Sequence, residues 1–233
     1  MAVHDPARRR RTPTQDRARA TVDAICAAAA GLIAEGGITA LTTNAIARRA
    51  GVSITAVYAY FPDKWAIAHE LFERFELARA GELAGLYDEF VTSDDWAAVV
   101  DRLWDRMARF RIETPGGVAL RQAILVEPQL AELDREGTVR AATAFAAAIV
   151  ARNPGVDPES AYRAAWSISL AAGPLIDDAV RDGSVRQAQL DDGKRLVIRH
   201  LEAFLGPART MPGQRAVPAQ GAAAAPRTTK PSR

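Results

Sequence analysis

Residues 41–64 read LTTNAIARRAGVSITAVYAYFPDK, and this stretch decides the fold. Thr42 or Thr43 can cap a short helix that runs to about Ala50, because a threonine hydroxyl accepts a hydrogen bond from a free backbone N–H of the first turn. Gly51 then supplies a left-handed stop, since glycine has no Cβ to clash in that conformation. The stretch therefore begins with one short helix and a tight turn.

The second half of the stretch predicts another helix. Ser53 can cap a segment from Ile54 to Tyr60, Pro62 ends it, and Asp63 caps a longer helix that runs to Ala80 or beyond. Two short helices joined by a glycine turn outline a helix-turn-helix, whose second helix can enter the major groove of DNA. A helical hairpin in another all-α domain has the same outline.

Outward from this stretch the chain reads as further helices. Apolar positions recur at helical spacing, alanine is abundant, and glycine and proline cluster at a few boundaries. A first helix is expected from a cap at Thr14 to Gly36. Later helices are expected over residues 95–113, 118–126, 128–152, 161–181 and 186–205. The predicted fold class is all-α.

Charge is distributed unevenly along the chain. Residues 1–64 contain 9 Lys/Arg against 5 Asp/Glu, and residues 206–233 contain 5 against 0. The middle, residues 65–205, contains 16 against 23. A basic head on an acidic body favours a polyanion as partner of the head, although a solvated surface with two basic tails gives the same counts.

Several protein classes lack support in the sequence. No run of about 18 uncharged apolar residues indicates a membrane span. A basic run before residues 24–34 loosely resembles a secretory signal, but charged residues interrupt the approach and an amphipathic first helix is expected instead. The single Cys26 fits a reducing cytoplasm. Isolated histidines and the absence of a phosphate loop or nucleophile motif predict no metal, no cofactor and no enzyme activity.

A family resemblance covers about residues 17–73. The pieces AEGGITALTT, IARRAGVS and VYAYFPDK, followed by an apolar helix, resemble the DNA-binding domain of TetR-type (TetR/AcrR) bacterial transcriptional regulators. The resemblance implies a three-helix helix-turn-helix domain over residues 14–74, with the motif at about 42–61. It also implies a helical ligand-binding and dimerisation domain over residues 75–205. Residues 1–13 and 206–233 are expected to be a disordered basic arm and a disordered tail.

The function implied is that of a ligand-responsive regulator. Members of the family are homodimers that bind a double-stranded palindromic operator, and a small effector usually releases them from it. We therefore expect a cytoplasmic repressor with an apolar or amphipathic effector. A DNA-binding regulator controlled by a protein partner, or without any small ligand, is the alternative.

DNA contacts are assigned by residue type and family position. Thr43 and Lys64 suit phosphates, Asn44 can reach an adenine edge, and Tyr58 lies where the family often places a phosphate contact. Ile54 departs from the polar or basic residue that the family usually has there, and can read a thymine methyl. The expected DNA-binding residues are Thr42, Thr43, Asn44, Ser53, Ile54, Thr55, Ala56, Tyr58, Tyr60 and Lys64. The alternative for each of these residues is a solvated surface side chain that does not contact DNA.

Neighbouring residues have other expected roles. Val57 and Phe61 should pack the recognition helix on its domain. Arg48 and Arg49 should add nonspecific attraction to DNA. The arm Arg8–Arg11 can reach the adjacent minor groove, or can be a basic tail without contacts.

The effector site is less defined by the sequence. Aromatic and long apolar side chains on the middle helices line pockets or simply fill the core. The candidates for ligand binding are Trp104, Met107, Phe110 and Trp166, and a polar group of the ligand can be read by Arg121, Gln122 or Glu127.

The last two helices are the expected dimer surface. In residues 161–181, small residues permit close approach of a second helix: Ala164, Ala165, Ala171, Ala172 and Gly173. Asp177, Asp178 and Asp182 suggest a divalent cation on paper, but a charged helix end is the commoner explanation.

Overall fold

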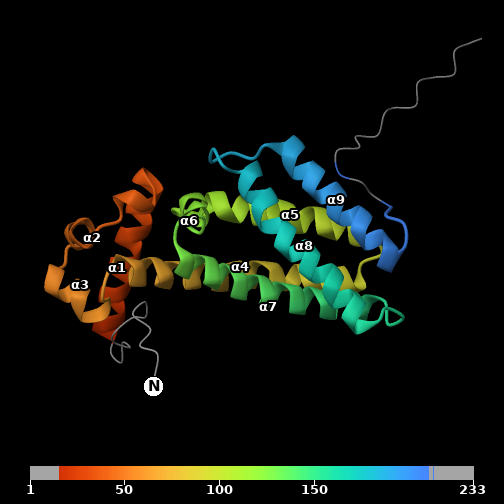
Figure 1. Cartoon of the computed structure of the whole chain (residues 1–233), viewed down its shortest axis with the longest axis horizontal. Helices are drawn as coiled ribbons and strands as arrows, with labels where there is room; N and C mark the ends of the chain where they lie inside the picture. The colour runs from red at the N-terminus through yellow and green to blue at the C-terminus, as the bar shows by residue number, and fades with distance from the viewer. Residues whose placement is uncertain (1–15, 210–211, 213–233) are drawn as a thin grey trace, which may run out of the picture.

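The structure is a computed structural model, and it describes residues 16–209 and 212. Within these residues the chain is all-α, without a strand (Figure 1). The elements are α1 (Asp16–Gly36), a 3₁₀ turn η1 (Ile38–Ala40), α2 (Thr43–Ala50), α3 (Ile54–Tyr60), α4 (Lys64–Thr92), α5 (Trp96–Glu113), α6 (Gly117–Ala123), α7 (Pro128–Arg152), α8 (Pro158–Ala179) and α9 (Gln187–Leu205). The predicted fold class is confirmed. The arm Arg8–Arg11, the cap at Thr14 and most of the predicted tail lie outside the described residues.

Two predicted boundaries differ from the structure by three residues, and the other differences are of one or two residues. Helix α6 ends at Ala123 rather than at residue 126, and i→i−3 turns follow it, with Val126 N–H bonded to the Ala123 carbonyl at 3.1 Å. Helix α8 begins at Pro158 rather than at residue 161, because Asp157 caps it through Ser160 N–H at 2.9 Å and proline is tolerated in a first turn.

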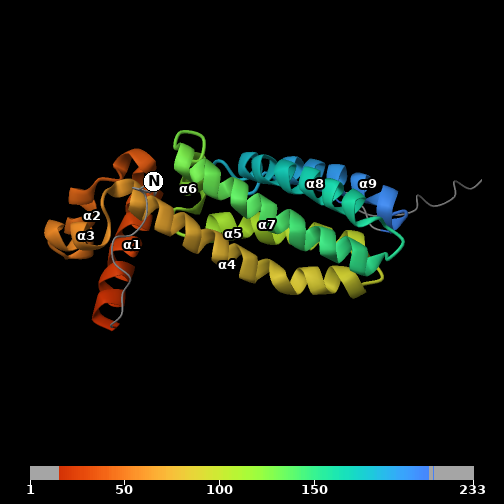
Figure 2. The same cartoon turned by 60° about the horizontal axis from the view of Figure 1, so that its bottom comes forward.

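The first three helices form a head at one end of the elongated molecule, and helices α5 to α9 form the body (Figures 1 and 2). The head encloses a core between α1, α2, α3 and the first turns of α4. Ile25, Ile46, Phe61 and Phe72 are completely buried in it. Burial of such side chains contributes roughly 1.5–3 kcal/mol each relative to leaving them exposed.

Helix α4 links the head to the body without a break. Its first half contributes Phe72 and Phe75 to the head core, and its second half contributes Leu83 and Phe90 to the body core. The predicted division at residues 74/75 falls inside this helix. The head cluster also takes in side chains from α5, α6 and α7, namely Phe110, Leu120, Ala123 and Leu130. The two cores are therefore joined by shared elements rather than by a linker.

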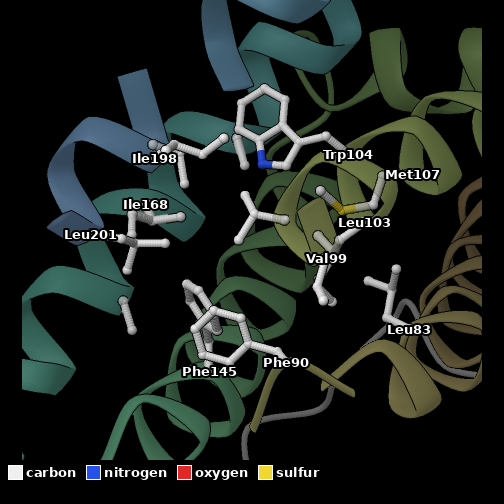
Figure 3. Close-up of a cluster of buried hydrophobic side chains, with 14 of the residues drawn as sticks. Leu83, Phe90, Val99, Leu103, Trp104, Met107, Phe145, Ile168, Ile198 and Leu201 are labelled. Atoms are coloured by element: carbon white, nitrogen blue, oxygen red, sulfur yellow. The ribbon is translucent and has the colours of Figure 1, made fainter. Parts of the chain in front are cut away.

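The body core lies between α4, α5, α7, α8 and α9. Figure 3 shows Trp104 reaching from α5 toward Ile198 of α9, with Phe145 of α7 and Phe90 of α4 below it. A methyl group on Gly193 of α9 would lie 2.4 Å from Cζ3 of Trp104, so this glycine lets α9 approach the indole closely. None of the helices within residues 16–209 is long and apolar enough to cross a membrane.

Candidate DNA-binding surface and effector cavity

The caps predicted for the helix-turn-helix are present. The Thr42 hydroxyl accepts from the N–H of Ala45 at 3.2 Å and starts α2, and the Ser53 hydroxyl accepts from the N–H of Ala56 at 3.1 Å and starts α3. Gly51 has φ 66° and ψ 28°, the left-handed conformation that ends α2. These local signals fix the turn between the two helices.

The inner face of α3 anchors it to the head. Val57 and Phe61 are completely buried, which confirms their expected packing role. Ile54 and Tyr60 are partly buried and pack against the same cluster. Ile54 thus has a packing role, and a thymine contact through its remaining surface stays a prediction.

The outer face carries hydroxyl and amide groups. The hydroxyls of Thr43 on α2 and Tyr58 on α3 are hydrogen-bonded at 3.2 Å, and Tyr58 is 44% exposed. Asn44 and Thr55 are exposed on the same two helices. The structure therefore places Thr43 and Tyr58 in contact and leaves Asn44 and Thr55 exposed, whereas Ile54 and Tyr60 are turned partly toward the core.

The basic residues of the head divide into two groups. Lys64, at the first position of α4, extends over the Trp65 ring with Nζ 4.6 Å from the centroid. Arg49 donates to Glu35 of α1 at 2.6 and 2.8 Å, so its charge is largely neutralised within the head. Only Arg48 of this pair is left for the nonspecific attraction expected of both, and it is exposed.

A cavity of about 80 Å³ lies in the body, with walls from α4 to α9. Its apolar wall includes Val100, Leu103, Trp104, Met107 and Phe145, several of which are labelled in Figure 3. This is smaller than the ~300–1,000 Å³ usual for ligand pockets, so a ligand here is small or widens the cavity.

The other wall is charged. Arg121 donates to Asp134 and, through Nε and Nη2, to both oxygens of Asp177 at 2.9–3.2 Å. Arg79 donates to Glu76 at 2.5 Å. The Arg121 pairs join α6 to α7 and α8 beside the cavity, whereas Arg79 and Glu76 pair within α4.

Arg111 of α5 is the exception on this wall. It is 4% exposed, and its Nε lies 3.0 Å from Oδ1 of Asp177. Among the described residues, neither its Nε nor its Nη1 has a hydrogen-bond partner. Burial lowers the pKa of Arg111 to about 9, and although Asp177 acts to raise that pKa, Arg121 and Arg79 act to lower it. Burial also acts to lower the pKa of Arg121, but Asp177 and Asp134 outweigh it and raise that pKa above its ordinary value.

The four ligand-binding candidates separate in the structure. Trp104 and Met107 line the cavity. Phe110 lies in the head cluster, with its ring centroid 5.0 Å from that of Phe75, and Trp166 stacks on Tyr162 at 6.5 Å on the outside of α8. Of the polar candidates, only Arg121 lines the cavity. On α5, Phe110 and Trp104 point to different sides of the helix, because Phe110 is rotated by about 120° from Trp104 around the helix axis.

Sequence reasoning named Arg121 but missed the other residues of the charged wall. Arg111 lies about 20° from Trp104 around α5, so its place on the apolar stripe of that helix was a usable signal. Asp177 lies in the last turn of α8, as expected for a charged helix end, and it also pairs with Arg121 and Arg111 in the body. Asp178 pairs instead with Arg181 at 2.9 Å. Within the residues described, no cluster of three or more potential metal ligands was found.

The head has the geometry of a helix-turn-helix DNA-binding domain, and the body is a helical domain with a cavity. Residues 25–71 match the family model described as bacterial regulatory proteins, tetR family, and residues 95–201 match the tetracyclin repressor-like C-terminal domain. The chain belongs to the TetR family of transcriptional regulators, and its helix-turn-helix is the family's DNA-binding element.

Solved structures of the family share the fold. A TetR-family regulator from Streptomyces coelicolor is 22% identical, with a TM-score of 0.58, and the match covers 79% of this chain and 99% of that one. SmeT, the repressor of the Stenotrophomonas maltophilia multidrug efflux pump SmeDEF, is 20% identical, with a TM-score of 0.62 and coverage of 85% and 96%. A regulator from Pectobacterium atrosepticum is 17% identical, with a TM-score of 0.61 and coverage of 84% and 100%. No curated protein matches the sequence.

Proposed function

We propose that this protein is a homodimeric repressor that a small apolar or amphipathic effector releases from a palindromic operator. The observation that carries the proposal is the position of the cavity, whose α5 wall continues directly into the contact with the head. Operator DNA is in the cytoplasm of a bacterium, and we place the protein there.

Two contacts connect the cavity wall to the head. Phe110, between cavity residues Met107 and Arg111 on α5, packs on Phe75 in the head core. The turn after α5 contains Gly116 at φ 72°, and a methyl group there would lie 2.8 Å from the carbonyl oxygen of Ala30 in α1. Movement of the end of α5 must therefore move α1, or break these contacts.

A dimer makes such movement effective. One short recognition helix makes few base contacts, whereas a two-fold dimer reads two half-sites at a fixed spacing of about 34–36 Å or a multiple of it. Reorienting the heads changes that spacing, so phosphate and base contacts are lost together. The hydroxyl face of α2 and α3, with Lys64, supplies those contacts in this proposal.

An outward apolar stripe on the last two helices supports the dimer surface. Tyr162 and Leu170 of α8 and Leu196 of α9 are 39%, 57% and 58% exposed. The expected role of small residues is wrong in part, because Ala164, Ala165 and Ala172 are buried within the protomer. The large exposed residues are the better candidates for contact with a second copy.

Filling the cavity tests the effector site. Ala141 of α7 lines the cavity, and Ala144 is exposed on the same helix. A thermal-shift screen first identifies compounds that raise the Tm, and operator mobility shifts then measure release. We expect Ala141→Leu to weaken effector binding by about tenfold or more, since it removes cavity volume, while operator affinity without effector stays within twofold. Ala144→Leu should change neither.

Compounds that bind without weakening operator affinity would favour control by a protein partner instead. The dimer surface has its own test by light scattering after gel filtration. Leu170→Glu should give monomers, because a buried unpaired charge is costly at an interface. Leu77→Glu, on the 77% exposed Leu77 of α4, should leave the dimer intact. Dimers in both variants would contradict the assignment of α8.

A further inference from the structure

Of the three buried cations among the described residues, two are fully paired and Arg111 is not. Lys194 of α9 is 1% exposed, and its Nζ lies 2.6 and 2.9 Å from Asp105 and Asp101 and 3.5 Å from Asp191. Arg121 is held by two carboxylates. Arg111 has only a share of Asp177, whose oxygens already accept three hydrogen bonds from Arg121.

A buried cation without full charge compensation destabilises the folded protein. Removing a charged group from water without hydrogen bonds and a counterion is among the larger penalties in a folded protein. The Nε of Arg111 is 3.0 Å from Asp177, but its N–H does not point at that oxygen, and Nη1 has no acceptor among the described residues. Arg111 therefore has donors and positive charge to offer to another molecule.

Arg111 lines the cavity together with Trp104, Met107 and Phe145. A molecule there faces apolar and aromatic walls on one side and an incompletely paired guanidinium on the other. The opposite charges near it are committed, since Glu76 accepts from Arg79 and Asp134 from Arg121. A neutral or cationic group at this end of the cavity would leave the Arg111 donors without charge compensation, whereas a carboxylate would supply it.

We infer that the effector is a small apolar carboxylate whose anionic group binds Arg111 and whose hydrocarbon part lies against Trp104 and Met107. This deepens the proposed function and rests on it. A carboxylate brings the acceptor oxygens and the negative charge that the buried guanidinium lacks, and charge-assisted bonds of this kind are the stronger ones. Recognition of the carboxylate by Arg111 is thus a specificity-determining contact.

The position of Arg111 also connects ligand charge to the head. It lies one residue after Phe110, and a methyl group on Gly117 would lie 2.5 Å from the Arg111 carbonyl oxygen. A carboxylate that draws Arg111 toward the cavity and away from Asp177 would move the last turn of α5 and the turn packed on α1.

The test compares carboxylates with their neutral amides on the full chain. The probes are benzoate with benzamide, 3-phenylpropionate with 3-phenylpropanamide, and octanoate with octanamide, measured by calorimetry at pH 7. At least one carboxylate should bind roughly 10- to 100-fold tighter than its amide. Arg111→Met should abolish this preference, whereas Arg109→Met, at an exposed arginine of the same helix, should keep it. Arg111→Lys, which retains the charge, should keep part of it.

Three results would overturn the inference: equal binding of acids and amides, a carboxylate preference that survives Arg111→Met, or no binding of any of the three carboxylates. The proposed function is tested separately by operator mobility shift. An amide that binds as tightly as its carboxylate and releases DNA would refute the anion site but keep the effector-responsive repressor. A carboxylate that binds through Arg111 without changing operator affinity would keep the anion site but refute the effector-responsive repressor.

Discussion

Replacing each of the two buried arginines of the cavity by methionine should change stability by different amounts, with a large loss for Arg121 and none for Arg111. Arg121→Met leaves Asp134 and Asp177 without their main partner, in a wall where these side chains are 29% and 27% exposed. Breaking a buried pair by removing one member costs about 3–5 kcal/mol, and the partial exposure of the two carboxylates places this loss at about 3 kcal/mol. For a chain of this size, that corresponds to a fall in Tm of roughly 6–12 °C.

Arg111→Met removes a cation that the fold does not fully pair. Its folded-state pKa of about 9 lies below the ordinary value of 12.5, so the charged form is destabilised in the folded protein at neutral pH. Asp177 keeps its bonds to Arg121 in this variant. We therefore expect a Tm equal to that of the wild type or a few degrees higher, as for other buried charges replaced by an apolar side chain of similar volume.

Thermal unfolding followed by circular dichroism at 222 nm, at pH 7 and without effector, measures both variants. Urea unfolding gives the free energy independently. Equal losses of several kcal/mol in the two variants would refute the reasoning, because they would show that Arg111 is as fully paired as Arg121.

Further predictions concern the operator and the packing of glycine. Lys64→Ala should weaken operator binding at all sequences and reduce the salt slope by about one unit, whereas an unchanged slope would remove the phosphate contact. Tyr58→Phe should weaken operator binding with little change in Tm, since its hydroxyl is exposed; a fall of many degrees in Tm would assign Tyr58 to the core. Gly193→Ala should lower the Tm, because overpacking against Trp104 costs about 1–3 kcal/mol, while Gly81→Ala, with open space at its Cβ, should raise it. Equal shifts in the two glycine variants would contradict the close approach of α9.

The structure of the head was predictable because its helix caps and turns depend on neighbouring residues in the sequence. Thr42, Ser53 and Asp63 cap helices through N–H groups two or three residues away, and Gly51 ends α2 by its own backbone conformation. Burial of Phe61 follows from the apolar side of one short helix. None of these statements needs knowledge of where distant segments lie.

The cavity was only partly predictable because its chemistry joins distant segments. Arg111 and Asp177 meet through the packing of α5 on α8, and no local pattern gives that pairing. Phe110 and Trp166 illustrate the same limit, since an apolar residue on a helix can face any neighbouring element. Helical position does distinguish Phe110 from Met107, but it cannot say which of the two faces the cavity.

The continuity of α4 has a mechanical consequence. Its 29 residues make a rod about 44 Å long, with one end in the head core and the other in the body core. Each degree of tilt about the body end displaces the head end by roughly 0.8 Å. In a dimer both α4 helices tilt, so a rotation of a few degrees in each protomer adds up at the DNA. The two recognition helices are then displaced by several ångströms relative to the fixed spacing of the major grooves.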